Sequence, residues 1–376
     1  MDEIWVKRRR LYGRRRKPAS RESCGFSGRP EPRTRIHAAD CRTVRRSAGC
    51  YGGSAIPRFG IPRFGEPFAE PFGEIARQRR SGRPMTEPNH VIAGLSAVAG
   101  RYDGFILDLW GTIHNGVEPL PGAVDCLRAL AQRGKTVLIL SNAPRRSAAV
   151  FGRMDAVGIP RDCYGPVLSS GEAGWLALRA RADPWHAALG DRAFLIGEAG
   201  DESVLQDQAI EETGSLDRAT FLLCVGAFRR TDTVADYAAL LAEARARNLP
   251  MLCVNPDLEV LRGPVREICA GAIAARYAAL GGDVGYHGKP HRPIYTLSFA
   301  RFPGIPPARI LAVGDSLRTD IAGANGAGID SLFITGGLLA DELGIAPLAD
   351  PPPAALPPLY ARHRQRPTWA AAAFRW

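Results

Sequence analysis

The chain lacks any run of about 18 uncharged apolar residues, the length that a membrane-spanning helix needs. The arginines near its start are not followed by the apolar stretch of a secretory signal. Its eight cysteines show neither CxxC pairs nor zinc-like spacing. Five of them lie mostly in apolar runs, where we interpret them as small core residues: Cys126, Cys163, Cys224, Cys253 and Cys269. These absences argue against a membrane protein, a zinc module and a disulfide scaffold, and the expected location is the cytoplasm.

Positive charge is confined to the first part of the chain. The net charge is +11 at pH 7, but Met1–Pro84 holds 21 Lys and Arg against 8 Asp and Glu, a net of +13. The remaining residues hold 28 basic against 30 acidic side chains, a net of −2. With 45% hydrophobic and 23% charged residues, the 376-residue chain has a globular composition and room for two domains.

The tail, residues 1–84, differs from the rest. It contains KRRRLYGRRRK (Lys7–Lys17) and the imperfect repeat IPRFGIPRFGEPFAEPFGE (Ile56–Glu74), with no lasting helical or strand period. Such a segment buries too little apolar surface to offset its ordering entropy, so we expect disorder. Clustered arginines are typical of a nucleic-acid-binding arm, but we disfavour nucleic acid as a partner of this chain. Because Met85 lies at the composition boundary, we favour the hypothesis that translation starts there and that the tail is a start-site artefact.

Beyond the tail, apolar strands alternate with helical patterns. The expected strands are FIL (Phe105–Leu107), TVLIL (Thr136–Leu140), ILAVG (Ile310–Gly314) and SLFIT (Ser331–Thr335). Helical spacing follows at 123–133, at 145–157 and after the third strand through residue 324, with Gly134 and Gly158 as helix ends. Continuous apolar strands joined by helices predict an α/β fold whose parallel sheet is doubly wound, with helices on both faces.

A second α/β pattern interrupts the first. Strands are expected at 194–197, 220–226 and 251–255, and helices at 233–247 and 265–280. We therefore assign residues 85–143 and 288–376 to a core domain and residues 144–287 to an inserted α/β domain. The closing PTWAAAAFRW either adds a final strand or packs as an anchor, and the DPPPAALPP before it is expected to be a linker.

Polar side chains follow three strands of the expected core sheet. They are Asp108, Ser141 and Asp315. Ligands of open α/β sheets bind at the carboxyl edge of the strands, so we expect a site there. Each feature also has a simpler interpretation: Asp108 suits a helix N-cap, and Lys289 in HGKPH suits a surface turn. HGKPH is not a Walker P-loop, because Pro290 replaces the required Ser or Thr.

Taken in order, the features are more specific. A strand-end Asp (Asp108), a strand-end Ser (Ser141), a lysine beside glycine (Lys289) and GDSLRTD (Gly314–Asp320) form an ordered set. The chain thereby resembles the haloacid dehalogenase-like (HAD) superfamily over about Asp103–Gly337. The insertion, with its VNPD motif, resembles the cap domain of subfamily IIA, which includes 4-nitrophenylphosphatase-like and pyridoxal-phosphatase-like members. DLWGTIHNG with SNAPR is most similar to an uncharacterised bacterial branch with tryptophan in this motif.

The resemblance implies a hydrolase that acts on a small phosphorylated metabolite. Asp108 is then the nucleophile that forms an aspartyl-phosphate, and Lys289 neutralises the phosphoryl oxygens. The resemblance also implies Mg²⁺ as cofactor and assigns further residues. The metal ligands are Asp108, the Trp110 carbonyl, Asp315 and, through water, Asp320, and the substrate contacts are Thr112, Ser141, Asn142 and Lys289.

Trp110 departs from the family pattern, in which a second Asp protonates the leaving group. Indole has no titratable proton at neutral pH, so Trp110 cannot act as this acid, although its carbonyl can still bind metal. His114 is either a substitute acid or a loop-structuring residue. A general acid contributes about 10²–10⁴-fold in rate, so the sequence predicts a slow or unusual phosphatase.

Two alternatives to the phosphatase stay open. One is a phosphonatase-like HAD hydrolase, which also keeps Mg²⁺ without the second Asp. The other is a catalytically weak HAD protein that binds a phosphorylated ligand. The substrate is left open as well, because pocket candidates such as Glu172 and Asn255 are equally explained as turn residues. The oligomeric state, monomer or homo-oligomer, is not readable from the sequence.

Overall fold

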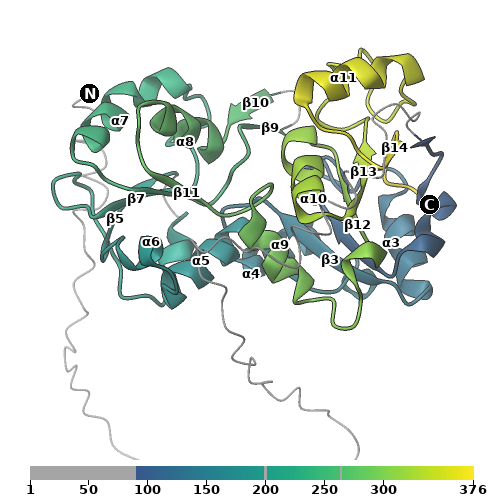
Figure 1. Ribbon diagram of the computed structural model, residues 1–376, viewed down its shortest axis with the longest axis horizontal. Coiled ribbons are helices and arrows are strands. Elements are labelled where there is room, and N and C mark those ends of the chain that lie inside the picture. Colours follow the sequence, from purple (N-terminus) through teal and green to yellow (C-terminus); the bar gives the residue numbers. More distant parts are fainter. Residues whose placement is uncertain (1–89, 199–200, 263–264) are drawn as a thin grey trace, which may run out of the picture. The chain divides into compact units, whose positions relative to one another are not determined.

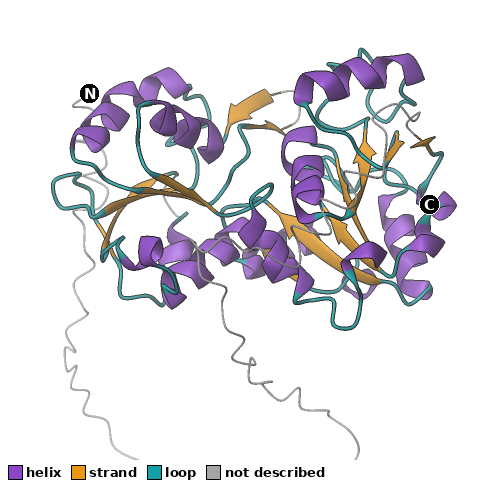
Figure 2. Ribbon diagram, viewed as in Figure 1, coloured by secondary structure: helices purple, strands orange, loops and turns teal. Residues whose placement is uncertain are grey.

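Two parallel sheets organise the described part of the chain. The structure is a computed structural model that describes residues 90–198, 201–262 and 265–376, all of which belong to one compact unit. The predictions made for residues 1–84 lie outside the described residues. Figure 1 shows the course of the chain and Figure 2 its helices and strands. None of the helices in the described part is long and apolar enough to cross a membrane.

The main sheet has seven parallel strands in the order β1-β14-β13-β12-β2-β3-β4. Their bounds are β1 His90–Val91, β2 Gly104–Leu107, β3 Thr136–Ser141, β4 Val167–Ser169, β12 Ile310–Gly314, β13 Asp330–Ile334 and β14 Trp369–Ala371. The helices around it are α3 Ala123–Gln132, α4 Ser147–Ala156, α9 Arg292–Phe299, α10 Ala322–Ala327 and α11 Leu356–His363. The four strands predicted for the core are all present in this sheet, which has the predicted α/β class. Of the two roles left open for the C-terminus, the structure shows the final strand, β14.

Strand side chains alternate between the two faces of this sheet. In β2, Phe105 and Leu107 join one hydrophobic core while Ile106 joins another. The first core is shared with α3 and α4, and the second with α9 and α10. Burial on both faces explains why the strand sequence is apolar throughout rather than alternating. All five cysteines of the described part are free and buried, as predicted.

The second sheet also has parallel strands, in the order β11-β8-β7-β5-β6. The strands are β5 Arg192–Ile196, β6 Glu211–Glu212, β7 Phe221–Cys224, β8 Met251–Cys253 and β11 Val284–Tyr286. Helices α7 (Ala238–Ala246) and α8 (Ala270–Ala279) cover one face, and α5 (Ser170–Ala180) and α6 (Pro184–Ala187) lie on the other (Figure 1). This is the predicted inserted α/β domain.

Three predictions need correction. Residues 265–280 were expected to form one helix, but β10 (Val265–Ile268) pairs antiparallel with β9 (Glu259–Arg262), and only α8 after it is helical. DPPPAALPP is not a linker, because α11 begins inside it and buries Leu356. The insertion was placed from residue 144, yet β4 at Val167–Ser169 pairs with β3 in the main sheet.

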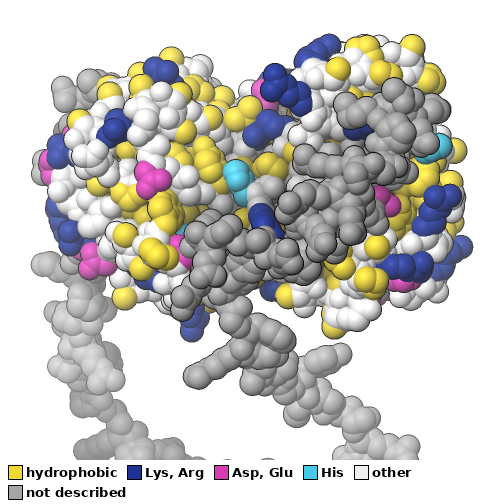
Figure 3. Space-filling model, in the orientation of Figure 1, with side chains coloured by type: hydrophobic (Ala, Val, Ile, Leu, Met, Phe, Trp, Pro, Cys, Tyr) yellow, Lys and Arg dark blue, Asp and Glu magenta, His cyan; other side chains and the backbone are white. Residues whose placement is uncertain are grey.

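Short helical turns complete the chain. They are η1 Leu95–Ala97, η2 Ala99–Arg101, η3 Arg161–Cys163, η4 Glu202–Leu205, η5 Val234–Tyr237, η6 Pro307–Arg309, η7 Leu317–Ile321 and η8 Pro353–Ala355. On the face shown in Figure 3, basic and acidic side chains are interspersed with hydrophobic ones. This mixture agrees with the nearly balanced charge of the chain beyond its tail.

Candidate active site

Asp108 lies directly after β2, at the carboxyl edge of the main sheet. Its backbone N–H donates to the Val313 carbonyl at 2.8 Å, which extends the pairing of β2 with β12 by one residue. The chain then turns at Gly111, whose φ of +79° favours glycine. A Cβ at Gly111 would lie 2.0 Å from Asp315 Oδ2. Glycine is therefore required three residues after Asp108, because the backbone there passes against the Asp315 carboxylate.

Asp315 and Asp320 come from the end of the neighbouring strand β12. The Asp315 Oδ2 accepts a hydrogen bond from the Leu338 N–H at 2.8 Å. Asp320 lies on η7, a single π-helical turn that continues into α10, and its Oδ2 accepts from the Ser316 N–H at 3.1 Å. A Cβ on Gly314 would lie 2.1 Å from the Asp320 carboxyl carbon. The GDSLRTD motif thus places both carboxylates at one edge of the sheet.

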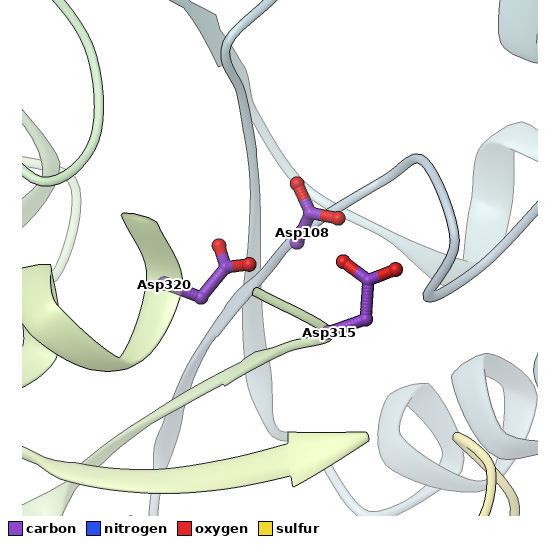
Figure 4. Close-up of side chains that lie close together, drawn as sticks. All are labelled: Asp108, Asp315 and Asp320. Atoms are coloured by element: carbon purple, nitrogen blue, oxygen red, sulfur yellow. The ribbon is translucent and has the colours of Figure 1, made fainter. Parts of the chain in front are cut away.

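The three carboxylates form one buried group. One oxygen from each of Asp108, Asp315 and Asp320 lies within 4.8 Å of the others. Figure 4 shows the three side chains directed toward a common space. The sequence predicted this convergence from residues more than 200 positions apart. The separation satisfies the distance that a shared coordination sphere requires.

Lys289 lies between two of these carboxylates. Its Nζ donates to Asp108 Oδ1 and forms an ion pair with Asp320 Oδ1 at 2.8 Å. A third bond, at 3.0 Å, goes to the backbone carbonyl of Leu140. The ammonium is 3% exposed and uses all three of its protons. The Gly-Lys-Pro turn therefore holds the single cation of the group rather than a surface lysine.

Burial and like charge control the pKa values of this group. Burial raises the pKa of Asp108 although the Lys289 charge opposes it. Burial and then the repulsion from Asp108 raise the pKa of Asp315 well above its usual range. Burial, opposed by Lys289, raises the pKa of Asp320 to about 6. Burial alone would lower the pKa of Lys289, but the surrounding carboxylates, Asp257 among them, outweigh it and raise this pKa. One ammonium does not balance three carboxylates.

A divalent cation fits this arrangement. The donors are all oxygens, which hard cations prefer. The absent side chains of Gly111 and Gly337 leave room beside the Asp315 carboxylate, since a Cβ at either position would lie within 2.4 Å of its Oδ2. A cation between the carboxylates would also offset the excess negative charge.

The remaining predicted substrate residues differ in what they offer. Ser141, the last residue of β3, accepts a hydrogen bond from the Ala143 N–H at 3.2 Å, which leaves its own hydroxyl hydrogen for donation. The Thr112 hydroxyl is fully buried and has no hydrogen-bond partner among the described residues. The Asn142 side chain, in contrast, bonds to Asp257 and to both backbone groups of Lys289. Its amide is therefore used within the protein.

Trp110 directs its side chain to the second domain. Its indole N–H donates to the Leu261 carbonyl of β9 at 2.9 Å. His114 lies edge-on against the indole, and its Nδ1 accepts a hydrogen bond from the Gly116 N–H at 2.8 Å. Burial, aided by the charge of Arg153, lowers the pKa of His114 to about 4. His114 is therefore neutral at pH 7, which favours the loop-structuring interpretation over the substitute acid.

Two contributors to the site were not assigned from the sequence. Asp257 of the VNPD motif bonds to Asn142 at 3.0 Å. Arg318, next to Asp320 on η7, donates to the Pro256 carbonyl. Glu172, which was a pocket candidate, lies in the first turn of α5. Its carboxylate accepts hydrogen bonds from the Arg146 guanidinium and from the Ser147 N–H. The sequence identified VNPD as a motif of the cap, but only the fold shows that it contacts Asn142 and Arg318 of the core.

Comparison with known proteins agrees with this geometry. A family model described as haloacid dehalogenase-like hydrolase matches residues 105–211, and one described as HAD-hydrolase-like matches residues 286–356. Chronophin from Rattus norvegicus is 30% identical over 268 residues, which cover 68% of this chain and 84% of the relative. D-glycerol 3-phosphate phosphatase from Mycobacterium tuberculosis is 27% identical and covers 65% and 66% of the two chains. A haloacid dehalogenase-like hydrolase structure from Brucella suis has a TM-score of 0.64, with 32% identity over 75% of this chain and 99% of that one.

The sheet order, the carboxylate group at its edge and these likenesses define a hydrolase with an inserted α/β domain. The chain belongs to the haloacid dehalogenase-like family, and within it to the phosphatases of subfamily IIA. The second domain is accordingly the cap domain of this subfamily.

Proposed function

We propose that the chain is a Mg²⁺-dependent phosphatase that hydrolyses a small phosphorylated metabolite through an aspartyl-phosphate at Asp108. The observation that supports this proposal is the buried group of Asp108, Asp315 and Asp320 with Lys289 bonded to two of its members. Related proteins whose names specify phosphatases of small phosphate esters support the substrate class.

The residues divide the reaction between them. An Asp108 oxygen forms a bond to phosphorus while the bond from phosphorus to the leaving oxygen breaks. Water then attacks the aspartyl-phosphate and releases inorganic phosphate and the free Asp108 carboxylate. Lys289 holds its charge beside the attacking oxygen, and the Ser141 hydroxyl is available to the phosphoryl oxygens, whereas the Thr112 hydroxyl is fully buried. Mg²⁺, held by Asp108, the Trp110 carbonyl, Asp315 and Asp320, would supply positive charge against the phosphate.

None of the described site residues is placed to protonate the leaving group. Trp110 has no acidic proton to give to a departing alkoxide, and His114 is neutral with its Nδ1 already engaged. Substrates whose leaving group departs without a proton should therefore be hydrolysed faster than simple alkyl phosphates. This discrimination follows from position 110.

The test is hydrolysis of 4-nitrophenyl phosphate and a panel of metabolite phosphates, with Mg²⁺ and with EDTA. We expect turnover with Mg²⁺ only, and none in Asp108→Asn, which keeps the side-chain shape but removes the nucleophilic charge. If no ester is hydrolysed by the wild-type protein while phosphate esters still bind, the protein is a ligand-binding HAD protein and the proposal is wrong.

A further inference from the structure

The cap loop Asn255–Asp257, which follows β8, contacts the core domain at two points. The Asp257 Oδ1 accepts a hydrogen bond from Asn142 Nδ2 at 3.0 Å. The Pro256 carbonyl accepts one from the guanidinium of Arg318, two residues before Asp320. One short loop of the cap therefore contacts both the segment after β3 and the turn that carries a site carboxylate.

Asn142 connects this loop to the backbone of Lys289. Its Oδ1 accepts from the Lys289 N–H at 2.8 Å, and its Nδ2 donates to the Lys289 carbonyl at 3.0 Å. Both hydrogen-bonding groups of the lysine backbone are thus bound by one side-chain amide. The fit is tight, because a Cβ at Gly288 would lie 2.7 Å from Asn142 Oδ1 and 2.7 Å from Pro256 Cδ.

The Asp257 carboxylate favours one orientation of this amide. An ionised carboxylate only accepts hydrogen bonds, so it selects the orientation in which Nδ2 faces it. Rotating the Asn142 amide by half a turn would direct its oxygen at Asp257 and its NH₂ group at the Lys289 N–H. The carboxylate therefore supports the orientation that binds the lysine backbone, with a charge-assisted hydrogen bond.

We propose that Asp257 is a positioning residue that acts through Asn142 to hold the Lys289 ammonium between Asp108 and Asp320. This inference rests on the proposed function and adds a cap residue to its machinery. If Asp257 has this role, the position of the Lys289 ammonium depends on the contact between the cap and the core. A displacement of about 1 Å at a reacting group can cost about 10²-fold in rate, so a residue outside the site can have a large effect.

Three variants separate positioning from general cap attachment. Asp257→Ala removes the acceptor, while Asp257→Asn keeps an oxygen that can face Asn142 Nδ2. Asp201→Ala is the matched control, because it breaks a cap-to-core ion pair with Arg145 (2.7 Å) that does not contact Lys289. With 4-nitrophenyl phosphate and Mg²⁺, we expect kcat to fall about 10- to 100-fold in Asp257→Ala with KM nearly unchanged. We expect Asp201→Ala to stay within about threefold of the wild type, and Asp257→Asn to lose less than Asp257→Ala, because its amide keeps an acceptor for Asn142 Nδ2 but no longer selects one orientation.

A spectroscopic readout tests positioning without turnover. The sequence contains only four lysines, Lys7, Lys17, Lys135 and Lys289, so ¹⁵N-lysine labelling gives a simple amide spectrum. The Lys289 resonance is assigned by its disappearance in Lys289→Met. We expect it to shift in Asp257→Ala, to shift less in Asp257→Asn, and to stay in place in Asp201→Ala.

An unmoved Lys289 resonance in folded Asp257→Ala, or an equal loss of kcat in Asp201→Ala, would overturn the positioning role. If Asp257→Ala does not fold, Asp257→Asn tests the same link, because it removes the charge that favours one orientation of the Asn142 amide, and an unmoved Lys289 resonance in that variant would overturn the role. The Asn142→Ala/Asp257→Ala double variant should lose no more activity than Asn142→Ala alone, since both act through one link. A wild type without turnover would refute the proposed function while the resonance still tests the link.

Discussion

Trp110 donates its indole N–H to the backbone carbonyl of Leu261 at 2.9 Å, and this bond joins the turn after Asp108 to strand β9 of the cap. The ring also packs against its own loop: its centroid lies 5.3 Å from that of His114, and a Cβ at Gly116 would lie 2.3 Å from the indole. Trp110 is thus a structural contact between the domains at a position that supplies no proton.

Replacing Trp110 with Asp should supply a proton donor for the leaving group. We expect Trp110→Asp to raise the rate for an alkyl phosphate relative to 4-nitrophenyl phosphate by at least about tenfold, since general acids contribute about 10²–10⁴-fold. Lost packing offsets part of this gain. Trp110→Asn is the control, because it loses the same packing without gaining a proton donor. An equal change of the rate ratio in both variants would contradict our account of this position.

Gly111 should be essential for metal affinity. Gly111→Ala places a Cβ 2.0 Å from Asp315 Oδ2 in a backbone conformation with φ of +79°. Gly134→Ala is the matched control, since its φ is +64° but no atom lies within 4 Å of the added carbon. We expect both variants to lose about 1 kcal/mol of stability from backbone strain. Only Gly111→Ala should lose Mg²⁺ affinity, by at least tenfold in calorimetric titration. Equal affinities would refute the close approach.

Removing the Lys289 charge should destabilise the metal-free protein. Lys289→Met leaves two buried carboxylates without their cation, and breaking a buried ion pair costs about 3–5 kcal/mol. Lys135→Met is the control, because Lys135 pairs with the partly exposed Asp103 and should cost about 1 kcal/mol or less. Urea unfolding measures both. Mg²⁺ should recover part of the loss in Lys289→Met, since it offsets the same charge; no recovery would argue against a metal beside this lysine.

Four of the seven strands of the main sheet, β2, β3, β12 and β13, were predicted, because each is a largely apolar run in the local sequence, and β12 matches its predicted range residue for residue. The short strands β1 and β4 were not predicted, since two or three residues carry no readable pattern. The hairpin β9–β10 was not predictable in this way. Val265–Ile268 is followed after one residue by α8, so its pattern merges with that of the helix, and its strand state depends on pairing with Glu259–Arg262.

Proline misled the prediction before the C-terminus. Several prolines suggested a linker, but prolines are compatible with the first turn of a helix, and α11 has proline there. Its Leu356 and Leu359 are buried against Phe333 of β13 and its neighbours. That tertiary burial decides in favour of a helix and is not visible locally.

In the candidate site, too, some features were predictable from local sequence and others depended on the fold. The side chains that follow strands could be placed at one edge from topology alone, and the carboxylate group confirms that placement. The partners of Asn142 could not be predicted, because Asp257 and Lys289 are 115 and 147 residues away and lie beside it only in the folded protein. A local pattern identifies a side chain, whereas its bonding depends on distant residues.

His291 should make the free energy of unfolding depend on pH. Burial, with the charge of Arg318, lowers the pKa of His291 to about 4 in the folded protein, against about 6.5 when unfolded. The unfolded state therefore binds more protons between these values, so stability falls as pH drops from 6.5 toward 4. His291→Phe preserves the stacking on Tyr286, whose ring lies 4.7 Å away, and removes the titration.

Asp320 titrates with the opposite sign, because its folded pKa of about 6 is raised, and it is present in both proteins. The difference between variant and wild type therefore isolates His291. The free energy of unfolding is measured in urea at pH 7, 6 and 5. We expect His291→Phe to gain stability relative to the wild type as pH falls, by at most about 1.4 kcal/mol per pH unit. Parallel stability curves would show that His291 is protonated as readily in the folded protein as in the unfolded chain, and would remove the burial argument for this side chain.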